Sequence, residues 1–214
     1  MKRFAILPMF ALALLAGCSQ DEETLTQQRT RMVSYLTSTH NPRLVAEENL
    51  EAGSEMPFYS VLDGAVYRYI DSDVYYNPDR QEQPEVGDDS RVTVTLTSYA
   101  FSFSNITTIP DGGITQSNIS RITMPFYSND PAFEQYFTYA GLTMPGAWSF
   151  EPLTLDLRSA DIIKGLRLAL VGCRQGDRVE AYMTYDVAYG AKKYMYFIPK
   201  QTPVAIFFTV DRVD

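Results

Sequence analysis

The sequence predicts an α+β protein in which an antiparallel β-sheet packs on one short helix. Several segments alternate apolar and polar residues with the period of two that half-buried strands require. A short amphipathic stretch over residues 160–171 has a helical period instead, and turn signals separate the alternating segments. The composition, with 45% hydrophobic and 21% charged residues among 214, is that of a globular protein able to bury one core.

The N-terminus has the features of a targeting segment rather than of the fold. Lys2 and Arg3 precede an apolar stretch, residues 4–15, that is too short to span a membrane. It ends in LAGC, residues 15–18, which resembles the lipobox of bacterial lipoproteins. This resemblance implies cleavage before Cys18 and lipidation of its thiol, whereas in a plain secretory signal Cys18 would be incidental. We therefore assign residues 1–17 to a lipoprotein signal peptide.

Residues 18–55 are predicted to form a lipid anchor, an acidic tether and a helix. The stretch SQDEETLTQQ after the anchor resembles the export signal that sends some lipoproteins of the Bacteroides group to the outer cell surface. A helix is expected over residues 24–39, ended by Asn41-Pro42. Because its length is marginal, we expect its apolar face to dock on the domain. That face comprises Leu25, Met32, Val33 and Leu36.

Residues 56–214 are predicted to form the β-rich domain. A hairpin is expected around Asp63-Gly64 in FYSVLDGAVYRYI. The clearest strand is RVTVTLTSYAF, which alternates apolar residues with threonine. Residues 102–150 have no sustained period, and so long an irregular stretch is usually functional, mobile or an added subdomain. Three later strands have the apolar positions Leu153, Leu155 and Leu157; Val179, Ala181 and Met183; and Val204, Ile206, Phe208 and Val210.

The order of elements from residue 151 onward resembles the C-terminal half of FKBP-type peptidyl-prolyl isomerases. IIKGL, LVGCRQGDR, DVAYG, FIP and VAIFFTV follow the family's helix, turn, tyrosine corner, loop and last strand in sequence. Upstream, EVGDDSRVTVTLTSYAF resembles the family's GDTVTVHYTGTL. The resemblance covers about half of the mature chain. It implies an FKBP-like fold, an antiparallel sheet wrapped on one short helix, with an insertion at about 102–150.

The same resemblance implies a substrate pocket. Its catalytic candidates are Tyr189, the tyrosine of the corner, and Ile163, whose N–H belongs to the first helical turn, where backbone donors lack helical partners. Gly165 costs a helix about 1 kcal/mol relative to alanine, which indicates a close approach to that face. The substrate-binding candidates are Ile162, Leu166, Phe126, Tyr194, Phe197, Ile198 and Ile206.

Several positions depart from the family pattern. Leu166 stands where the family has a tryptophan at the pocket floor. Tyr127 stands where the family has an acidic wall residue. Asp130 could reach into the pocket in its place, but its alignment lies beyond a long insertion. Taken alone, aliphatic residues at such positions are typical of an ordinary core. Aliphatic residues also occupy the aromatic wall positions: Leu96, Leu153 and Ile206.

Charge and the scarcity of reactive residues argue against other functions. Loss of Lys2 and Arg3 would change the net charge from −8 to −10, which disfavours nucleic acid as a partner. The single histidine, His40, ends the predicted helix, so neither a histidine-based triad nor a metal site is expected. Cys173, the one cysteine besides Cys18, is expected to be a small buried residue. No cofactor is expected.

Aromatic residues in the insertion allow two interpretations. They would form either a stacking platform for carbohydrate or peptide, or a cover for the sheet, and we favour the cover. The residues concerned are Tyr136, Phe137, Tyr139, Trp148 and Phe150.

Together, these patterns predict a lipid-anchored peptidyl-prolyl cis-trans isomerase that helps proteins fold at the outer membrane or cell surface. The altered pocket predicts reduced or substrate-restricted activity. The alternative is a non-catalytic FKBP-like module that binds peptide, glycan or another protein. The expected partners are proline-containing segments of envelope proteins and the membrane, reached through lipidated Cys18, and the protein is expected to be a monomer.

Overall fold

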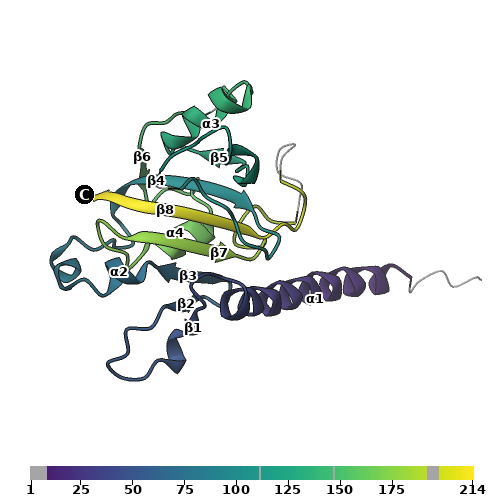
Figure 1. Ribbon diagram of the computed structural model, residues 1–214. Helices are drawn as coiled ribbons and strands as arrows, with labels where there is room; N and C mark the ends of the chain where they lie inside the picture. The colour runs from purple at the N-terminus through teal and green to yellow at the C-terminus, as the bar shows by residue number, and fades with distance from the viewer. Residues whose placement is uncertain (1–8, 111, 147, 192–197) are drawn as a thin grey trace, which may run out of the picture.

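The computed structural model describes residues 9–110, 112–146, 148–191 and 198–214, with side chains from Thr24 onward. A twisted sheet carries helix α4 (Lys164–Leu170) on one face and the C-terminal part of helix α1 (Met9–Ser38) on the other (Figure 1). Helix α3 (Ala132–Ala140) lies in a segment beyond one edge. This arrangement confirms the predicted α+β class. The short turns are α2 (Ser72–Tyr75), η1 (Glu47–Asn49), η2 (Pro78–Glu82) and η3 (Ile119–Arg121).

The sheet has the order β1-β2-β3-β7-β8-β4-β5, and β6 also pairs with β4. β1 and β2 are parallel, and the other pairs between the described strands are antiparallel. The last two strands in the sequence, β7 and β8, lie at the centre of the sheet. They pair with each other and with the earlier strands β3 and β4, respectively. The strands are β1 (Val45–Ala46), β2 (Phe58–Leu62), β3 (Val66–Ile70), β4 (Arg91–Ala100), β5 (Tyr127–Ser128), β6 (Leu153–Asp156), β7 (Arg178–Met183) and β8 (Val204–Val213).

The turn between β2 and β3 is the predicted hairpin around Asp63-Gly64, with residues 63–65 between the paired Leu62 and Val66. Asp63 has φ of 49° and Gly64 has φ of 62°, so both residues are left-handed. A hairpin turn that matches the twist of its strands requires two consecutive residues in the left-handed conformation. An Asp-Gly pair adopts this conformation readily. The strands pair directly on both sides of the turn, at Leu62 and Val66.

Strand β4 is bordered along its length by β8, but its other edge is shared between two strands. β6 pairs with residues 91–94 and β5 with residues 97–98. Between them the buried side chain of Asn129 takes the place of a strand: its Oδ1 accepts from Leu96 N at 2.6 Å, and its Nδ2 donates to Val94 O at 3.0 Å. This satisfies backbone groups that would otherwise be buried without partners.

The main core lies between the sheet and α4, as the alternation predicted. Phe208 is 4% exposed, and Leu155 is partly buried against the same cluster. Cys173 is fully buried in this core, and burial raises the pKa of its thiol to about 12. The predicted role of Cys173 as a buried apolar residue is thus confirmed. The core includes Val92, Val94, Leu96, Leu166, Leu170, Val179, Ala181, Met183, Ile206, Phe208 and Val210.

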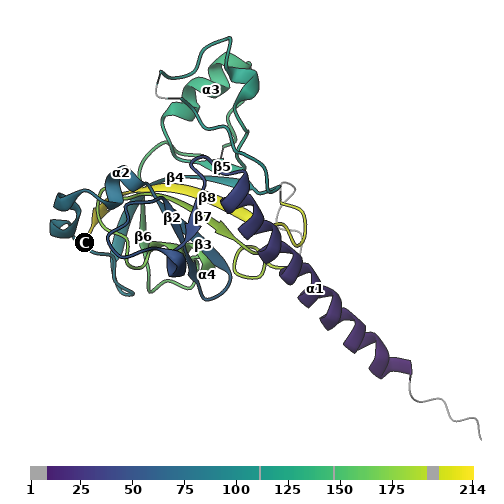
Figure 2. The ribbon, with the colours of Figure 1, turned by 60° about the horizontal axis from the view of Figure 1, so that its bottom comes forward.

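The second core lies where α1 docks on the opposite face of the sheet. Met32 and Leu36 are fully buried there, as expected, and Tyr35 is 4% exposed. The prediction that Val33 shares this face is wrong, since Val33 is 37% exposed; positions 32, 35 and 36 follow the helical period and 33 does not. The helix ends at Ser38, close to the expected end, but begins at Met9 rather than at 24, and its N-terminal part projects from the domain (Figure 2).

No helix within the described ranges is both long and apolar enough to cross a membrane.

His40, directly after α1, is buried and fixes the end of this helix to the sheet. Its Nε2 lies 2.8 Å from Oε2 of Glu180 on β7, and its Nδ1 contacts the carbonyl of Pro42. Tyr182 also donates to Glu180. Burial by itself lowers the pKa of His40, but the hydrogen bond and charge of Glu180, with the Pro42 carbonyl, raise it above 6.5 overall.

The His40–Glu180 pair makes the stability of this fold depend on pH. Because the folded-state pKa of His40 is raised, its contribution is fully present below the unfolded value and is lost as the pH rises through the folded value. We expect the free energy of unfolding, measured with urea from about pH 6 to about pH 9, to fall in the wild type and to change less in His40→Gln. Equal slopes in the two proteins would contradict this assignment.

The segment between β4 and β6 has a small core of its own. Trp148 is 8% exposed, and its ring lies 5.1 Å from that of Phe137 and 6.0 Å from that of Tyr127 on β5. Trp148 therefore packs inside the insertion and against the edge of the sheet, so its ring is not available as a stacking platform for a ligand. Tyr139, in contrast, is 52% exposed. The cluster comprises Ile114, Ile122, Phe133, Phe137 and Trp148.

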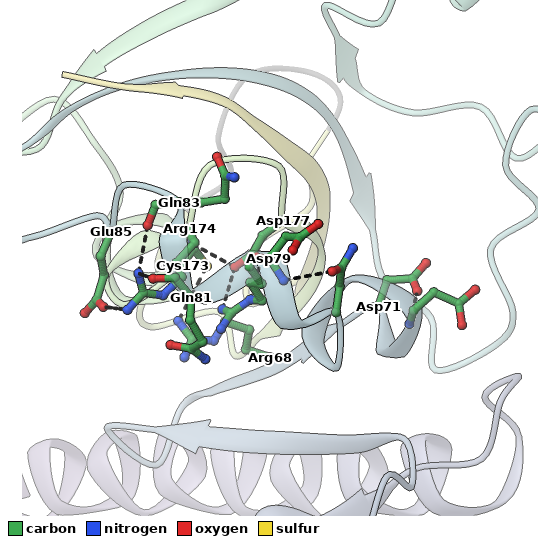
Figure 3. Close-up of polar contacts among 12 residues, drawn as sticks. Arg68, Asp71, Asp79, Gln81, Gln83, Glu85, Cys173, Arg174 and Asp177 are labelled. Atoms are coloured by element: carbon green, nitrogen blue, oxygen red, sulfur yellow. Dashed lines mark hydrogen bonds and ion pairs between the residues drawn. The ribbon is translucent and has the colours of Figure 1, made fainter.

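Arginine side chains hold the 71–86 segment and the end of α4 to the sheet (Figure 3). Arg80 binds Asp177 through two hydrogen bonds, of 2.7 and 2.8 Å, and both side chains are buried. Breaking one partner of such a pair is costly because the other charge stays buried. Arg68 donates to the carbonyls of Ala169 and Val171, at 3.1 and 2.7 Å, where the last turn of α4 lacks helical partners.

Candidate functional site

A groove of about 700 Å³ opens on the α4 face of the sheet, at the N-terminal end of α4. Strands β4 and β8 form its base, the start of α4 forms one wall, and β6 and the loop that follows it form another. We call it the α4-face groove. Its apolar lining residues are Leu96, Tyr127, Leu153, Leu155, Ile162, Ile163, Leu166, Ala188, Tyr189 and Ile206.

One wall of the groove is fixed by a close approach between α4 and the tyrosine corner, residues 185–190. Gly165 donates its N–H to Val187 O at 2.7 Å. A Cβ at Gly165 would lie 2.5 Å from Met183 Sδ and 3.1 Å from Val187 O. The glycine that the helix propensity disfavours is thus required by the packing, because a side chain would separate α4 from the corner.

The corner itself is a tight turn that presents Tyr189. Gly190 N–H donates to Tyr185 O at 2.8 Å, and Gly190 has φ of 78°, which favours glycine. The half-buried ring of Tyr189 meets that of Phe126 edge to face, with centroids 5.7 Å apart. This contact fixes the direction of the Tyr189 side chain along the groove.

Ile163 precedes α4 as its N-cap residue, in an extended conformation with φ of −59° and ψ of 141°. Its carbonyl accepts from Arg167 N at 3.2 Å. Its N–H has no hydrogen-bond partner among the residues that the structure describes. A half-buried donor therefore lies in the groove wall beside apolar side chains.

The structure brings together part of the predicted site. Among the candidates, those that line the groove are Tyr189, Ile163, Ile162, Leu166 and Ile206. Phe126 reaches the site through Tyr189 rather than as a lining residue. Ile198 is 4% exposed and is absent from the lining. Tyr194 and Phe197 lie outside the described residues, and Cys18 lies in the part of α1 whose side chains are not described.

Polar residues at the mouth of the groove were missed by the sequence analysis. Asp156 ends β6, and Asp161 lies in the loop between β6 and α4. Their only sequence signal was their position shortly before the start of the helix. Hydrogen bonds from Arg158 lower the pKa of Asp156, which keeps it ionised. Asp130 lies elsewhere, in a cleft on the opposite face of the sheet.

Helix α1 contacts the corner that lines the groove and the loop before β8. The buried side chain of Gln28 donates from Nε2 to Gln201 O at 2.8 Å and accepts at Oε1 from Tyr185 N at 3.2 Å. Tyr185 begins the corner that carries Tyr189, and Gln201 ends the loop before β8. The position of the corner therefore depends on the docked helix as well as on Gly165.

The described lining of the groove is suited to binding and orientation. Its base is aliphatic, and the described lining residues include no histidine, lysine or cysteine. In the described part of the chain, no group of three or more His, Cys, Asp or Glu side chains is placed to hold a metal ion. The groove can enclose a small apolar ring and offer one backbone N–H donor to a carbonyl beside that ring.

Comparison with known proteins places this geometry among the FKBP-like folds. Residues 141–211 match the family model of FKBP-type peptidyl-prolyl cis-trans isomerases, which covers about a third of the chain. The match includes β6, α4, β7 and nearly all of β8. Of these elements, β6, α4 and β8 line the groove, whereas β4, which also forms its base, lies outside the match. No curated protein matches the chain.

Two solved structures are similar at low identity. A peptidyl-prolyl cis-trans isomerase from Pseudomonas syringae pv. tomato superposes with a TM-score of 0.46 at 16% identity, covering 90% of this chain and 95% of that one. The N-terminal domain of FKBP42 from Arabidopsis thaliana gives a TM-score of 0.43 at 15% identity, covering 77% of this chain and 96% of that one.

The close approach at Gly165 is open to a direct test. We expect Gly165→Ala to lower the free energy of unfolding by about 1–3 kcal/mol, because overpacking outweighs the gain in helix propensity. Gly87→Ala is the control, since a Cβ there would make ordinary contacts of 3.6 and 3.7 Å. Urea denaturation of the three proteins gives the comparison, and a Gly165→Ala protein as stable as the wild type would contradict the packing argument.

Proposed function

We propose that this protein is a peptidyl-prolyl cis-trans isomerase that binds proline-containing segments in the α4-face groove. The observation that carries the proposal is the unpartnered Ile163 N–H in a groove of aliphatic side chains beside Tyr189. The proline ring would lie on Leu166 and Ile206. The carbonyl before it would accept from Ile163 N–H. The match of residues 141–211 to the isomerase family supports this assignment.

A groove of this kind suffices for prolyl isomerisation. The barrier to rotation about a peptide bond is about 18–20 kcal/mol, and no covalent bond is made or broken in crossing it. The twisted amide has lost its resonance and with it part of its charge separation. An apolar groove therefore favours the twisted amide over either planar isomer, provided that the substrate is held in place.

The aliphatic base predicts weaker or narrower activity than an aromatic one. Leu166 is 8% exposed at the base of the groove, and Leu96 and Ile206 lie beside it. Aliphatic side chains offer less flat contact area to a proline ring than an indole does. The second candidate function, a non-catalytic FKBP-like module that binds peptide, glycan or a partner protein, is favoured by this same observation.

A protease-coupled assay with prolyl peptides distinguishes the two functions. The protein is made from Ser19 onward, so that it is soluble without a lipid. We expect Tyr189→Phe to reduce kcat/KM a few-fold, because it removes the hydroxyl that would donate a hydrogen bond to the bound peptide. Such a bond contributes about 1 kcal/mol. Tyr139→Phe removes a hydroxyl from the exposed side of α3 and is the matched control, expected to retain wild-type activity.

Leu166→Trp supplies the complementary test. It is expected to raise the rate if the larger ring fits without overpacking. If the wild type only matches the uncatalysed rate and a folded Leu166→Trp protein is equally inactive, the isomerase proposal fails and the binding module is favoured. Melting temperatures of all variants show that they are folded.

We further propose that the protein is a bacterial lipoprotein of the cell envelope, attached at the outer membrane or cell surface through Cys18. Support comes from the LAGC sequence at residues 15–18 and the acidic stretch that follows it. Projection of α1 from the domain would hold the groove away from the bilayer. Gln28 lies ten residues beyond Cys18, which corresponds to about 15 Å along a helix.

Cys18→Ser is expected to release the protein from the membrane fraction of cells that express the full chain. The reason is that lipid transfer requires the thiol at this position. Fractionation followed by a high-salt wash measures the distribution, and Cys173→Ala, which removes the other thiol, should remain with the membranes. Retention of Cys18→Ser after the wash would exclude a lipid anchor at this residue.

A further inference from the structure

A second cleft lies on the α1 face of the sheet, opposite the α4-face groove. It has a volume of about 340 Å³ and lies between strands β4, β7 and β8 and the insertion. Two cross-strand rows form its base: Thr97 pairs with Phe207, which pairs with Glu180, and Thr95 pairs with Thr209. We call it the α1-face cleft.

Tyr99 is the buried polar side chain that this cleft leaves unsatisfied. It is 1% exposed and lines the cleft, on the same side of β4 as Thr95 and Thr97. Asp130 and Glu180 line the same cleft as Tyr99. Burial raises the pKa of Tyr99, and the charges of these two carboxylates raise it further. Among the described residues, this hydroxyl has no hydrogen-bond partner. In the part of the chain that the structure describes, the buried side-chain atoms that lack a partner are Nε atoms of arginines, so the Tyr99 hydroxyl is not sealed in the core but opens into the cleft.

The charges around the cleft are partly compensated within the protein. Asp71 is paired with Arg178 at 2.9 Å, and Glu180 is paired with His40 at 2.8 Å. Asp130 differs. Its Oδ1 accepts from Ala132 N at 2.9 Å, but within the described ranges its carboxylate has no cation beside it. Among the described residues the cleft therefore holds one carboxylate that forms no ion pair, and it shares the cleft with the Tyr99 hydroxyl.

We propose that the α1-face cleft binds a lysine or arginine side chain of a polypeptide segment. Asp130 would accept from the ammonium or guanidinium group, and the Tyr99 oxygen would accept a second hydrogen bond. The rings of Phe133 and Phe207, both in the lining, would contact the aliphatic part of the side chain. The volume suits a side chain rather than a folded partner.

A small neutral ligand fits these groups less well. The ionised carboxylate of Asp130 can only accept, and the oxygen of the Tyr99 hydroxyl can accept as well as donate. A cationic group with several N–H donors can therefore bond to both oxygens at once. The protein also carries a net charge of −8, which attracts basic segments from a distance. This site is separate from the α4-face groove and does not require isomerase activity.

Peptides without proline test the proposal independently of the groove. The probes are a fluorescent Gly-Ser-Lys-Ser-Gly peptide with blocked ends and the same peptide with norleucine, which has the shape of lysine without its amine. Fluorescence anisotropy of the soluble chain from Ser19 gives the Kd. We expect measurable binding of the lysine peptide at millimolar protein or below and at least about tenfold weaker binding of the norleucine peptide.

Asp130→Asn should weaken binding of the lysine peptide about tenfold, because it removes the charge while an amide oxygen can still accept from Ala132 N. Tyr99→Phe should weaken it about threefold. Glu134→Gln removes the same charge from the exposed side of α3 and should leave Kd unchanged. Equal binding of the two peptides, absence of binding, or an equal effect of Glu134→Gln would overturn the proposal.

Discussion

The contact of Gly165 with the Val187 carbonyl is the constraint on which the groove depends. Because Gly165 has no side chain, α4 lies directly on the corner, and the Gly165 N–H donates to Val187 O at 2.7 Å. This fixes the start of the helix, with Ile163, relative to Tyr189 on the corner. A binding groove made from two separate segments needs such a rigid contact, because a shift of about 1 Å is enough to spoil a catalytic geometry.

The other end of α4 is fixed by charge rather than by close packing. Arg68 satisfies the last carbonyls of the helix, and Arg80 is paired with Asp177 beneath the 71–86 segment. Arg80 is buried and bonds both oxygens of Asp177, so this pair has few alternative arrangements that satisfy it. The groove thus opens at the apolar end of α4, while the polar network lies at the far end.

The two faces of the sheet have different chemistry, and this follows from its alternation. On the α4 face, aliphatic residues such as Leu96 and Ile206 form both core and groove. On the α1 face, aromatic residues such as Tyr99 and Phe207 are interspersed with threonines and carboxylates. Helix α1 joins the two faces, since it packs on the aromatic face while Gln28 contacts Tyr185 of the corner that lines the groove and Gln201 of the loop before β8.

The sequence by itself determined which residues of β4, β7 and β8 face the core, because period-two alternation is local, and the order of motifs implied the FKBP-like fold. It also brought Ile162, Ile163, Leu166 and Tyr189 forward as one site. Only the tertiary structure decided that Asn129 completes the edge of β4, that His40 meets Glu180, and that Asp130 faces away from the groove. These contacts join residues from 33 to 140 positions apart, and no local pattern records which distant group a polar side chain will meet.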